Sequence, residues 1–386
     1  MENRMTMSTV EEAGEQRSSL DALQLAGASV LPMALKTAVE LGVLDIIHRA
    51  GPGAELSASQ IVSKLDSKNP RAAYLLDHML CLLATHSVLT CSVSPAHQSD
   101  GSQSQSCQRV YGLAPVSKYF IKDEQGGSLS PLLHLIQHRV VLDMWFHWKD
   151  AILEGGLPFE KAHGMSTMSY IHKDARFGEN FWETMNDLNK LFVVQMLEAY
   201  KGFEGLRSLV DVGGRDGSVL KMIISKYPSI KGVNFDLPSV IEKAPSIEGV
   251  ENVGGDMIQG VPKGEAILIK SFRSADRVTD LFCDCQQWVL HSWTDEECVK
   301  VFKNCHESLP ENGKVMVVDF VIPEAPDASL AVQSVFQLCM FMLSMNPNRN
   351  ERTEKDFDSL AKAAGFAGVR VFPCGYGFSL IEIYKN

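Results

Sequence analysis

The sequence predicts an α/β protein in which a doubly wound sheet fills the C-terminal half and a smaller, mainly helical domain precedes it. The first observation is the stretch 208–224, which reads as a buried strand, a tight glycine turn and a helix. The second is the regular alternation of strand-like and helix-like segments that follows it. The third is a pair of helical segments followed by two strand-like runs between residues 57 and 113, which is the order of a winged helix-turn-helix.

Composition narrows the classes of protein that fit. A chain of 386 residues is long enough for two domains, and 45% hydrophobic and 22% charged residues are ordinary for a globular protein. The net charge of -11 argues against a nucleic-acid-binding surface. No apolar run is long enough to span a membrane, and the polar N-terminus lacks the apolar core of a signal peptide. Nine cysteines without a paired spacing favour a reducing compartment, so we expect a cytoplasmic protein.

The first segments of the chain are a polar tail and an apolar stretch. Residues 1–19 are polar and acidic, and we expect a disordered tail there. From Leu20 to Ala50 the chain is strongly apolar and helix-forming, and Pro32 is expected to break or kink the helix. A core helix and a subunit interface fit this stretch equally well, so both interpretations stay open.

Residues 20–125 are expected to form one winged-helix-like domain. Ser57–Leu65 reads as a short capped helix and Arg71–His86 as an amphipathic helix, while 88–93 and 109–113 read as paired strands. The hairpin tip, 94–108, is rich in Ser and Gln and is expected to be a mobile insert. Acidic side chains offset the basic ones: Glu55, Asp66 and Asp77 against Lys64, Lys68 and Arg71. We therefore interpret the domain as structural or dimerising rather than DNA-binding.

Residues 126–200 are expected to be connecting helices. The helices predicted over Leu129–Leu153 and Phe177–Tyr200 carry many aromatic and Met side chains. Such a stripe is more often core than a substrate-binding surface. It becomes a candidate substrate wall only if a nucleotide pocket lies beside it.

The glycine turn at 213–214 favours a particular ligand. A dinucleotide fingerprint, G-x-G-x-x-G, would require glycine where the chain has Val212. The carboxylate of Asp211, ahead of the glycines, would repel a pyrophosphate but attract a cationic sulfonium group. These features fit S-adenosylmethionine, and they also fit a glycine turn that merely connects a strand to a helix.

Three further predicted strands end in side chains suited to the same ligand. The strand 231–236 ends in Asp236, about as far past the glycines as an acidic residue that binds ribose hydroxyls. The strand and exit loop 250–257 carry Asp256 for an adenine amino group and Met257 for the ring face, and the strand 266–270 ends in Lys270. Each carboxylate alone reads as a loop residue or cap. Together they lie at successive carboxyl ends of strands, where ligands of such sheets bind.

Several motifs in order along the chain resemble the plant caffeic-acid-type O-methyltransferases. They include Leu290-His-Ser-Trp-Thr-Asp-Glu-Glu-Cys298, Asn350-Glu-Arg-Thr-Glu-Lys-Asp-Phe357 and the segments 28–33, 51–54, 202–214, 226–238, 254–257 and 311–315. The resemblance covers nearly the whole chain from about Leu20. It implies a Rossmann-like S-adenosylmethionine-binding methyltransferase domain over residues 201–386, and an N-terminal winged-helix domain that forms a homodimer.

The resemblance also implies roles for individual residues. His291 would be the general base that takes the proton of the acceptor hydroxyl, steadied by Asp319 and Glu351. The cofactor positions would be Gly213, Asp236, Asp256, Met257 and Lys270. The substrate wall, part of it in 126–200, would be Leu142, Phe181, Met185, Phe341, Met342 and Asn346. The expected partners are a small phenolic acceptor and a second copy of the chain, with no nucleic acid, membrane or metal.

The chain departs from the family pattern at several positions. Arg215 stands where the family usually has a third glycine, and Asp319 replaces a glutamate. An additional segment, 271–287, separates Lys270 from His291. It reads either as a surface excursion, which we expect to loop away from the sheet, or as an error in the gene model.

These departures leave alternatives open. The Cys-x-Cys at 283 and 285 has no second ligand pair nearby, so we expect no metal site. The acceptor is a phenol in the favoured interpretation, and an amine or a carboxylate-bearing aromatic in another. In a third, Arg215 and the additional segment make the chain an inactive homologue that only dimerises with active relatives.

Overall fold

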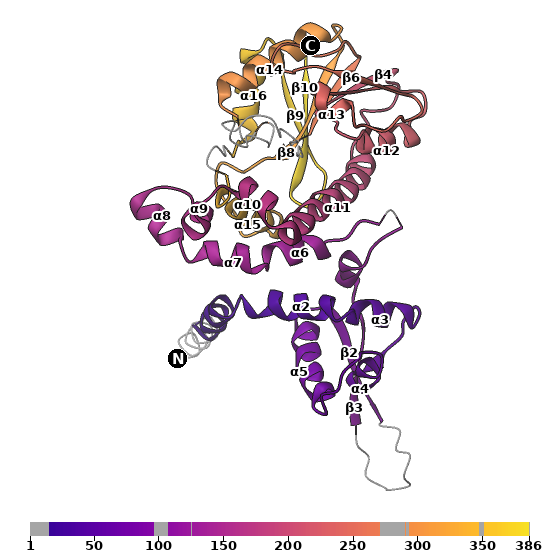
Figure 1. Ribbon diagram of the computed structural model, residues 1–386, viewed down its shortest axis with the longest axis vertical. Coiled ribbons are helices and arrows are strands. Elements are labelled where there is room, and N and C mark those ends of the chain that lie inside the picture. Colours follow the sequence, from indigo (N-terminus) through magenta and orange to yellow (C-terminus); the bar gives the residue numbers. More distant parts are fainter. Residues whose placement is uncertain are drawn as a thin grey trace, which may run out of the picture. The chain divides into compact units, whose positions relative to one another are not determined.

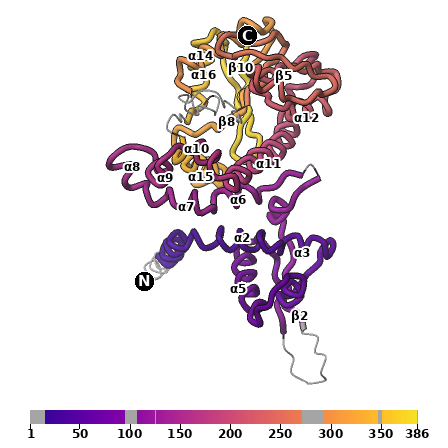
Figure 2. The backbone as a smooth tube through the Cα atoms, viewed as in Figure 1, coloured from indigo at the N-terminus to yellow at the C-terminus, as the bar shows by residue number. Residues whose placement is uncertain are grey.

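The computed structural model describes residues 15–95, 107–124, 126–270, 290, 293–346 and 351–385. The chain divides into two compact units, Met1–His138 and Arg139–Asn386. Figure 1 shows their helices and strands, and Figure 2 traces the backbone through each unit. Residues 1–14, most of the hairpin tip, the additional segment 271–287 and His291 lie outside the described residues.

The first unit is helical with a small antiparallel sheet. Its helices are an N-terminal helix (Glu15–Ala26), α2 (Val30–Glu40), α3 (Val43–Arg49), α4 (Ala58–Val62), α5 (Ala72–Thr85), the short 3-10 helix η1 (Pro115–Phe120) and α6 (Ser130–Ile136). Its strands are β1 (Leu56–Ser57), β2 (Leu89–Pro95) and β3 (Cys107–Leu113), in the sheet order β1-β3-β2. The predicted helix pair and strand pair are confirmed as α4, α5, β2 and β3.

Local sequence explains the two helices that precede the hairpin. Ser57 forms a capping box at the start of α4, since its hydroxyl accepts from Gln60 N at 3.3 Å and its N–H donates to the Gln60 side chain at 2.8 Å. In α5, the side chains of Leu76, Leu80 and Leu83 recur at helical spacing and are buried in the core of the unit.

The apolar N-terminal stretch breaks before Pro32 rather than at it. A helix over Glu15–Ala26 meets α2 at residues 27–29 with a bend of 50°. Pro32 is the third residue of α2, where first-turn N–H groups have no acceptor within the helix, so its ring removes no hydrogen bond. Residues 15–19, expected in the disordered tail, are helical. Among the described helices, none by itself is long and apolar enough to cross a membrane. The helix Glu15–Ala26 and α2 reach the required length and apolar composition only when they are taken together.

The second unit is built on a seven-stranded sheet. Its strands are β4 (Ser208–Val212), β5 (Lys231–Asp236), β6 (Val250–Gly254), β7 (Ala266–Lys270), β8 (Lys314–Phe320), β9 (Gly368–Pro373) and β10 (Phe378–Tyr384). The order across the sheet is β6-β5-β4-β7-β8-β10-β9. The first five strands in this order, β6, β5, β4, β7 and β8, are parallel to one another, whereas β10 is antiparallel to both of its neighbours. The four strands predicted in this unit are confirmed as β4, β5, β6 and β7.

Helices cover the sheet and extend from one end of it. They are α7 (Arg139–Trp145), α8 (Trp148–Glu154), α9 (Pro158–His163), α10 (Thr167–Lys173), α11 (Ala175–Ala199), α12 (Ser218–Lys226), α13 (Pro238–Ile241), α14 (Asp295–Ser308), α15 (Leu330–Leu343) and α16 (Glu354–Ala363). In Figure 1, α14 and α16 lie to one side of the sheet and α11 to α13 to the other. The prediction of one helix over Leu129–Leu153 is wrong. That range is divided among α6, α7 and α8, because tight turns separate these helices. At the turn between α7 and α8, for example, His147 N donates to Met144 O at 3.0 Å.

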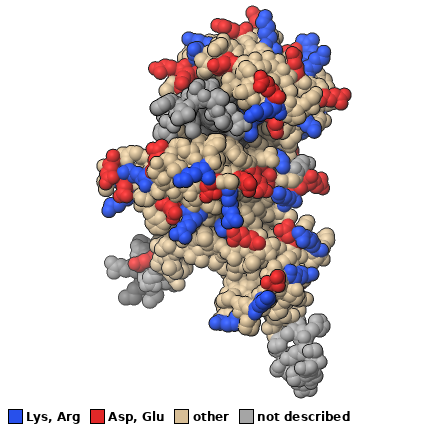
Figure 3. Space-filling model, viewed as in Figure 1, with Lys and Arg blue, Asp and Glu red and all other residues tan. Residues whose placement is uncertain are grey.

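The largest core of the second unit lies between the sheet and the pair α14 and α16. Alternate apolar residues of β4, β7, β8 and β10 are fully buried and pack against Val301, Phe302 and Phe357 of these helices. Figure 3 shows acidic and basic side chains interspersed on the face drawn, so the excess of negative charge forms no single patch there.

Candidate active site

The residues predicted to bind a cofactor lie along one edge of the large sheet. The register pairs Val212 at the end of β4 with Phe235 of β5 and Ile269 of β7, and pairs Asp236 with Gly254 of β6. The carboxyl ends of these four strands therefore reach the same edge, and Gly213, Asp236, Asp256, Met257 and Lys270 lie at or just after them. The strand order reverses between β4 and β7, which is where open α/β sheets bind their ligands.

The turn after β4 leaves no room for a side chain at Gly214. Gly213 has a φ of 74° and donates its N–H to Phe235 O at 2.8 Å, which ties the turn to the neighbouring strand. A Cβ atom on Gly214 would lie 2.1 Å from Asn234 Oδ1 and 3.0 Å from Asp211 Oδ2. These glycines thus hold the backbone close to two buried polar side chains.

Asp236 is fixed by the same turn. Its side chain is 1% exposed, and its two oxygens accept from Arg215 N at 3.2 Å and from Leu237 N at 2.7 Å. Asn234, two residues earlier, donates to Arg215 O at 2.9 Å and to Asn252 Oδ1 at 2.9 Å. Arg215 has a φ of 56°, in the left-handed region that favours glycine, so this network holds a residue in a strained conformation.

Asp211 and Lys270 form a buried ion pair beneath the turn. Lys270 donates to Asp211 Oδ1, and the side chains are 5% and 0% exposed. Burial raises the pKa of the Asp211 carboxyl, and the positive charge of Lys270 opposes that rise. The interpretation that the Asp211 charge awaits a cationic ligand is therefore wrong in detail, because Lys270 compensates it. Asp211 Oδ2 remains a buried acceptor without a partner among the described residues.

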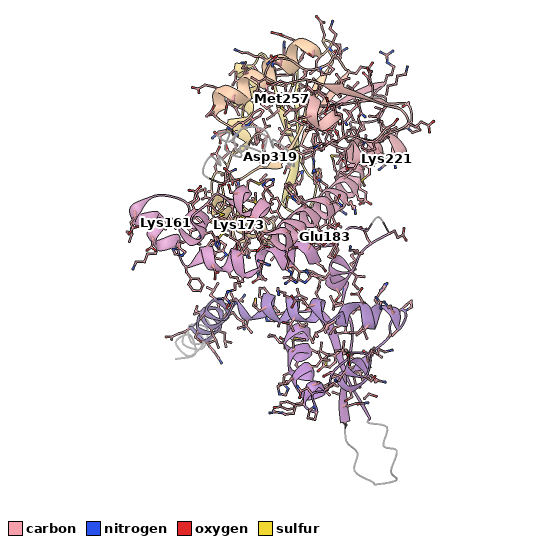
Figure 4. The ribbon with its side chains drawn as sticks, in the orientation of Figure 1. Lys161, Lys173, Glu183, Lys221, Met257 and Asp319 are labelled. Atoms are coloured by element: carbon pink, nitrogen blue, oxygen red, sulfur yellow. The ribbon has the colours of Figure 1, made fainter. Side chains whose placement is uncertain are left out.

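Asp256 and Met257 begin the loop after β6. Asp256 Oδ1 accepts from Ile258 N at 2.9 Å, so this carboxylate caps a tight turn. Met257 is buried against the core, and its carbonyl accepts from Asn304 Nδ2 at 2.7 Å. In Figure 4, Met257 lies beside α14 and Asp319 lies further toward α15.

The three residues predicted to perform catalysis come from different segments. Asp319 is buried near the end of β8 and accepts from Phe320 N at 2.8 Å. Glu351 lies just before α16 and accepts a hydrogen bond from the Cys339 thiol of α15, with 3.1 Å between Sγ and Oε2. His291 lies outside the described residues, between Leu290 and the start of α14.

The predicted substrate wall belongs to helices of the second unit. Leu142 is on α7, Phe181 and Met185 are on α11, and Phe341 and Met342 are on α15, with Asn346 just after it. All but the half-buried Leu142 are buried. The chain after α15 is anchored to α9 and α10, since Phe159 N donates to Ser344 O at 3.1 Å and Thr167 Oγ1 to Met345 O at 3.0 Å.

Sequence reasoning missed two polar residues of this region. Asn234 lies between Val233 and Phe235 in β5, and an amide between two apolar residues of a strand is the signal that could have identified it. Arg352 is 4% exposed and donates to the carbonyls of Leu290 and Trp293. Nothing in its local sequence distinguishes it from an exposed arginine.

Known protein families match both units. Residues 23–123 match the O-methyltransferase dimerisation domain, and residues 145–367 match the O-methyltransferase domain. The chain belongs to the O-methyltransferase family. This methyltransferase is 49% identical to caffeic acid 3-O-methyltransferase 1 of Populus tremuloides over 381 residues, which cover 99% of this chain and 98% of that one. It is 47% identical to the caffeic acid 3-O-methyltransferase of Medicago sativa with the same coverage.

Solved structures show the same fold. The methyltransferase CalO1 of calicheamicin biosynthesis, bound to S-adenosylhomocysteine (SAH), matches with a TM-score of 0.74 at 21% identity, over 96% of this chain and 98% of that one. Human N-acetylserotonin methyltransferase in complex with S-adenosylmethionine (SAM) matches with a TM-score of 0.69 at 18% identity and the same coverage. The protein is thus an S-adenosylmethionine-dependent O-methyltransferase with a Rossmann-like domain.

The residues at the sheet edge fit this cofactor. S-adenosylmethionine offers hydroxyl and amino donors, and the buried carboxylates of Asp236 and Asp211 are acceptors. The backbone of Gly214 lies close to Asp211, and the N–H of Arg215 donates to Asp236. Among the described residues no group of three or more His, Cys, Asp or Glu side chains is arranged to hold a metal ion.

Proposed function

We propose that this enzyme methylates a phenolic hydroxyl of a small phenylpropanoid-like acceptor, with His291 as the general base. The observation that carries the proposal is 47–49% identity, over nearly the full chain, to enzymes named for caffeic acid 3-O-methylation. Asp319 and Glu351 support it further. Asp319 follows Val318, which pairs with Lys270, and Glu351 precedes Arg352, which bridges Val321 just after β8. Both carboxylates therefore come from segments at the end of the sheet that carries the cofactor positions.

The proposed chemistry needs little from the protein beyond a base and good positioning. A phenol is a weak nucleophile until its proton leaves, so a neutral imidazole at position 291 would accept that proton as the oxygen reacts. S-adenosylmethionine would supply the electrophilic methyl group, with S-adenosylhomocysteine as the leaving group. Asp319 and Glu351 would orient the imidazole and stabilise the imidazolium that forms, and the imidazolium would later release its proton to water.

The cofactor and the acceptor are assigned to separate groups of residues. Gly213, Asp236, Asp256, Met257 and Lys270 would hold the cofactor. Lys270 would act through Asp211, to which it is bound, and Asp236 would accept from the ribose hydroxyls. The six wall residues, Leu142, Phe181, Met185, Phe341, Met342 and Asn346, would enclose the aromatic ring. Their mainly apolar, buried side chains suit a planar ring and leave Asn346 as the polar group.

Two further properties are proposed from the family. The dimerisation domain over residues 23–123 supports a homodimer, for which exposed Leu20, Leu23 and Leu25 on the first helix offer apolar surface. The scattered cysteines support a cytoplasmic location.

The test is methyl transfer from labelled S-adenosylmethionine to caffeic acid and to matched aromatic amines and carboxylic acids. The unaltered enzyme should methylate the phenolic hydroxyl. His291→Gln should lower kcat by about 10²–10⁴-fold without changing cofactor affinity. The matched control is His306→Gln on α14. His306 packs against Phe366, so this variant makes the same substitution in another part of the unit. Methylation of an amine alone, or near-normal turnover in His291→Gln, would contradict the proposal.

A further inference from the structure

Arg352 is an almost fully buried arginine bonded to two backbone carbonyls and one carboxylate. Its guanidinium donates to Leu290 O, to Trp293 O at 2.8 Å, and to Asp295 Oδ1 at 2.8 and 3.2 Å. Leu290 and Trp293 flank positions 291 and 292, and Asp295 is the first residue of α14. One side chain therefore holds both ends of the segment that contains the proposed base.

The backbone of Arg352 is bonded to the strand that carries Asp319. Arg352 forms a parallel bridge with Val321, and its carbonyl accepts from Ile322 N at 3.1 Å. Val321 follows β8, two residues after Asp319. The preceding residue in the chain is Glu351, whose carboxylate is held by Cys339. Arg352 thus connects the segments that carry all three proposed catalytic residues.

The ion pair with Asp295 alone does not account for the burial of this arginine. Burying a guanidinium carries a large desolvation cost, which a close, buried carboxylate partner can offset. The ion-pair partner of Arg352 here, Asp295, is 74% exposed, and exposed pairs contribute about 0–1 kcal/mol. An apolar side chain of similar size would avoid this desolvation cost, but it would leave the carbonyls of Leu290 and Trp293 without these donors. What the planar fork of arginine adds is several donors in fixed geometry for two carbonyls at once.

We propose that Arg352 is a positioning residue, which sets Leu290 and residues 293–295, on either side of positions 291 and 292, against the end of β8 and Glu351 for methyl transfer. This inference rests on the proposed function, because its consequence for the rate depends on a base at position 291. A displacement of about 1 Å in a reacting group can cost on the order of 100-fold in rate. Loss of the fork should therefore lower kcat and leave the cofactor site intact.

The variants Arg352→Lys and Arg352→Met test this role. Arg352→Lys retains the charge but replaces the fork by a single ammonium, which cannot satisfy both carbonyls in the same geometry. Both variants should lower kcat by about 10–100-fold, with KM for the acceptor and the Kd of S-adenosylmethionine changed less than about threefold. Hydrogen exchange should speed up at Trp293 and the first turn of α14 in both.

The matched control is Lys314→Met. Lys314 begins β8 and pairs with Glu382 at 2.9 Å, at the other end of the strand from Asp319, so its loss should destabilise the unit without touching residues 290–295. The comparison is made where Arg352→Lys and Lys314→Met lose the same amount of melting temperature. If the kcat of Arg352→Lys is then lowered no more than that of Lys314→Met, the proposal is overturned. Unchanged hydrogen exchange at Trp293 would overturn it as well. If Arg352→Met does not fold, the same comparison with Arg352→Lys decides.

The exchange measurement separates this inference from the proposed function. If the unaltered enzyme does not methylate phenols, or if His291→Gln keeps its turnover, the proposed function fails. Faster exchange at residues 293–298 in Arg352→Lys would still establish that Arg352 holds the segment. Slower turnover without faster exchange would refute the positioning role while leaving the proposed function in place.

Discussion

Removing Lys270 tests the electrostatics beneath the glycine turn. Lys270 and Asp211 are both buried and bonded to each other, so Lys270→Met leaves a carboxylate in the core without its counter-charge. Breaking a buried pair in this way costs about 3–5 kcal/mol, whereas replacing both partners by apolar residues is often nearly neutral. We therefore expect Lys270→Met to be about 3–5 kcal/mol less stable than the parent at pH 7. The double variant Asp211→Val, Lys270→Met should recover most of that loss.

The loss should also depend on pH in a defined direction. Burial raises the pKa of Asp211, and removing Lys270 takes away the main opposing charge, so the pKa of the folded variant rises further. Folded Asp211 then keeps its proton at pH values where the unfolded chain, with a pKa of about 3.9, has lost it. Stability consequently falls as pH rises above about 4, by up to about 1.4 kcal/mol per pH unit, until the folded pKa is passed. Among pH 5, 6, 7 and 8, Lys270→Met should be closest to the parent at pH 5, the value nearest the start of this fall.

Urea unfolding of the parent and the variants at pH 5, 6, 7 and 8 measures this. The control is Arg207→Met, because Arg207 and Glu265 pair at the other ends of the same two strands, with Arg207 85% exposed. That exposed pair should contribute no more than about 1 kcal/mol. The argument from the buried carboxylate would be refuted if the loss of unfolding free energy in Lys270→Met did not change with pH. It would also be refuted if that loss persisted in the double variant.

Three further changes test the site itself. Asp236→Ala should weaken S-adenosylmethionine binding by at least about tenfold in calorimetry, since charge-assisted hydrogen bonds are worth about 1.5–3 kcal/mol each; unchanged affinity would remove Asp236 from the cofactor site. Arg215→Val should be about 1–2 kcal/mol less stable than Arg215→Gly, because the φ of 56° is costly for a β-branched residue; equal stabilities in urea unfolding would argue against strain there. Deleting Ser271–Gln287 should preserve the melting temperature and preserve or raise turnover, since each doubling of loop length costs only about 0.6 kcal/mol; loss of both would make the segment part of the site.

The parts of the fold that depend on local signals were predictable. The β4 strand and its turn are encoded by a short apolar run and two glycines, and α4 by the capping pair Ser57 and Gln60. The break after Ala26 was misplaced at Pro32, because the first turn of a helix tolerates proline. The strands β8, β9 and β10 were not predicted. The position of β10 between its neighbours depends on contacts between distant segments, which no local pattern reveals.

The candidate site divides in the same way. Asp236 could be assigned from its spacing after the glycines, and it does lie at the carboxyl edge of the sheet. The interpretation of Asp211 failed because Lys270, 59 residues later, reaches it only through the register of β4 and β7. Arg352 was missed for a related reason: its carbonyl partners are about 60 positions away, and its burial follows from tertiary packing alone.

The antiparallel strand β10 has a consequence for biosynthesis. It lies between β8 and β9 yet follows both in the chain, so both leave the ribosome before the strand that joins them. Until then β8 presents an unpaired edge, which is a template for association with other chains. A stop codon after Pro373 would make that exposure permanent and remove Leu380, Ile381 and Ile383, all fully buried. Such a truncated product would lack only a short segment, yet it should aggregate or be degraded rather than accumulate as a shortened enzyme.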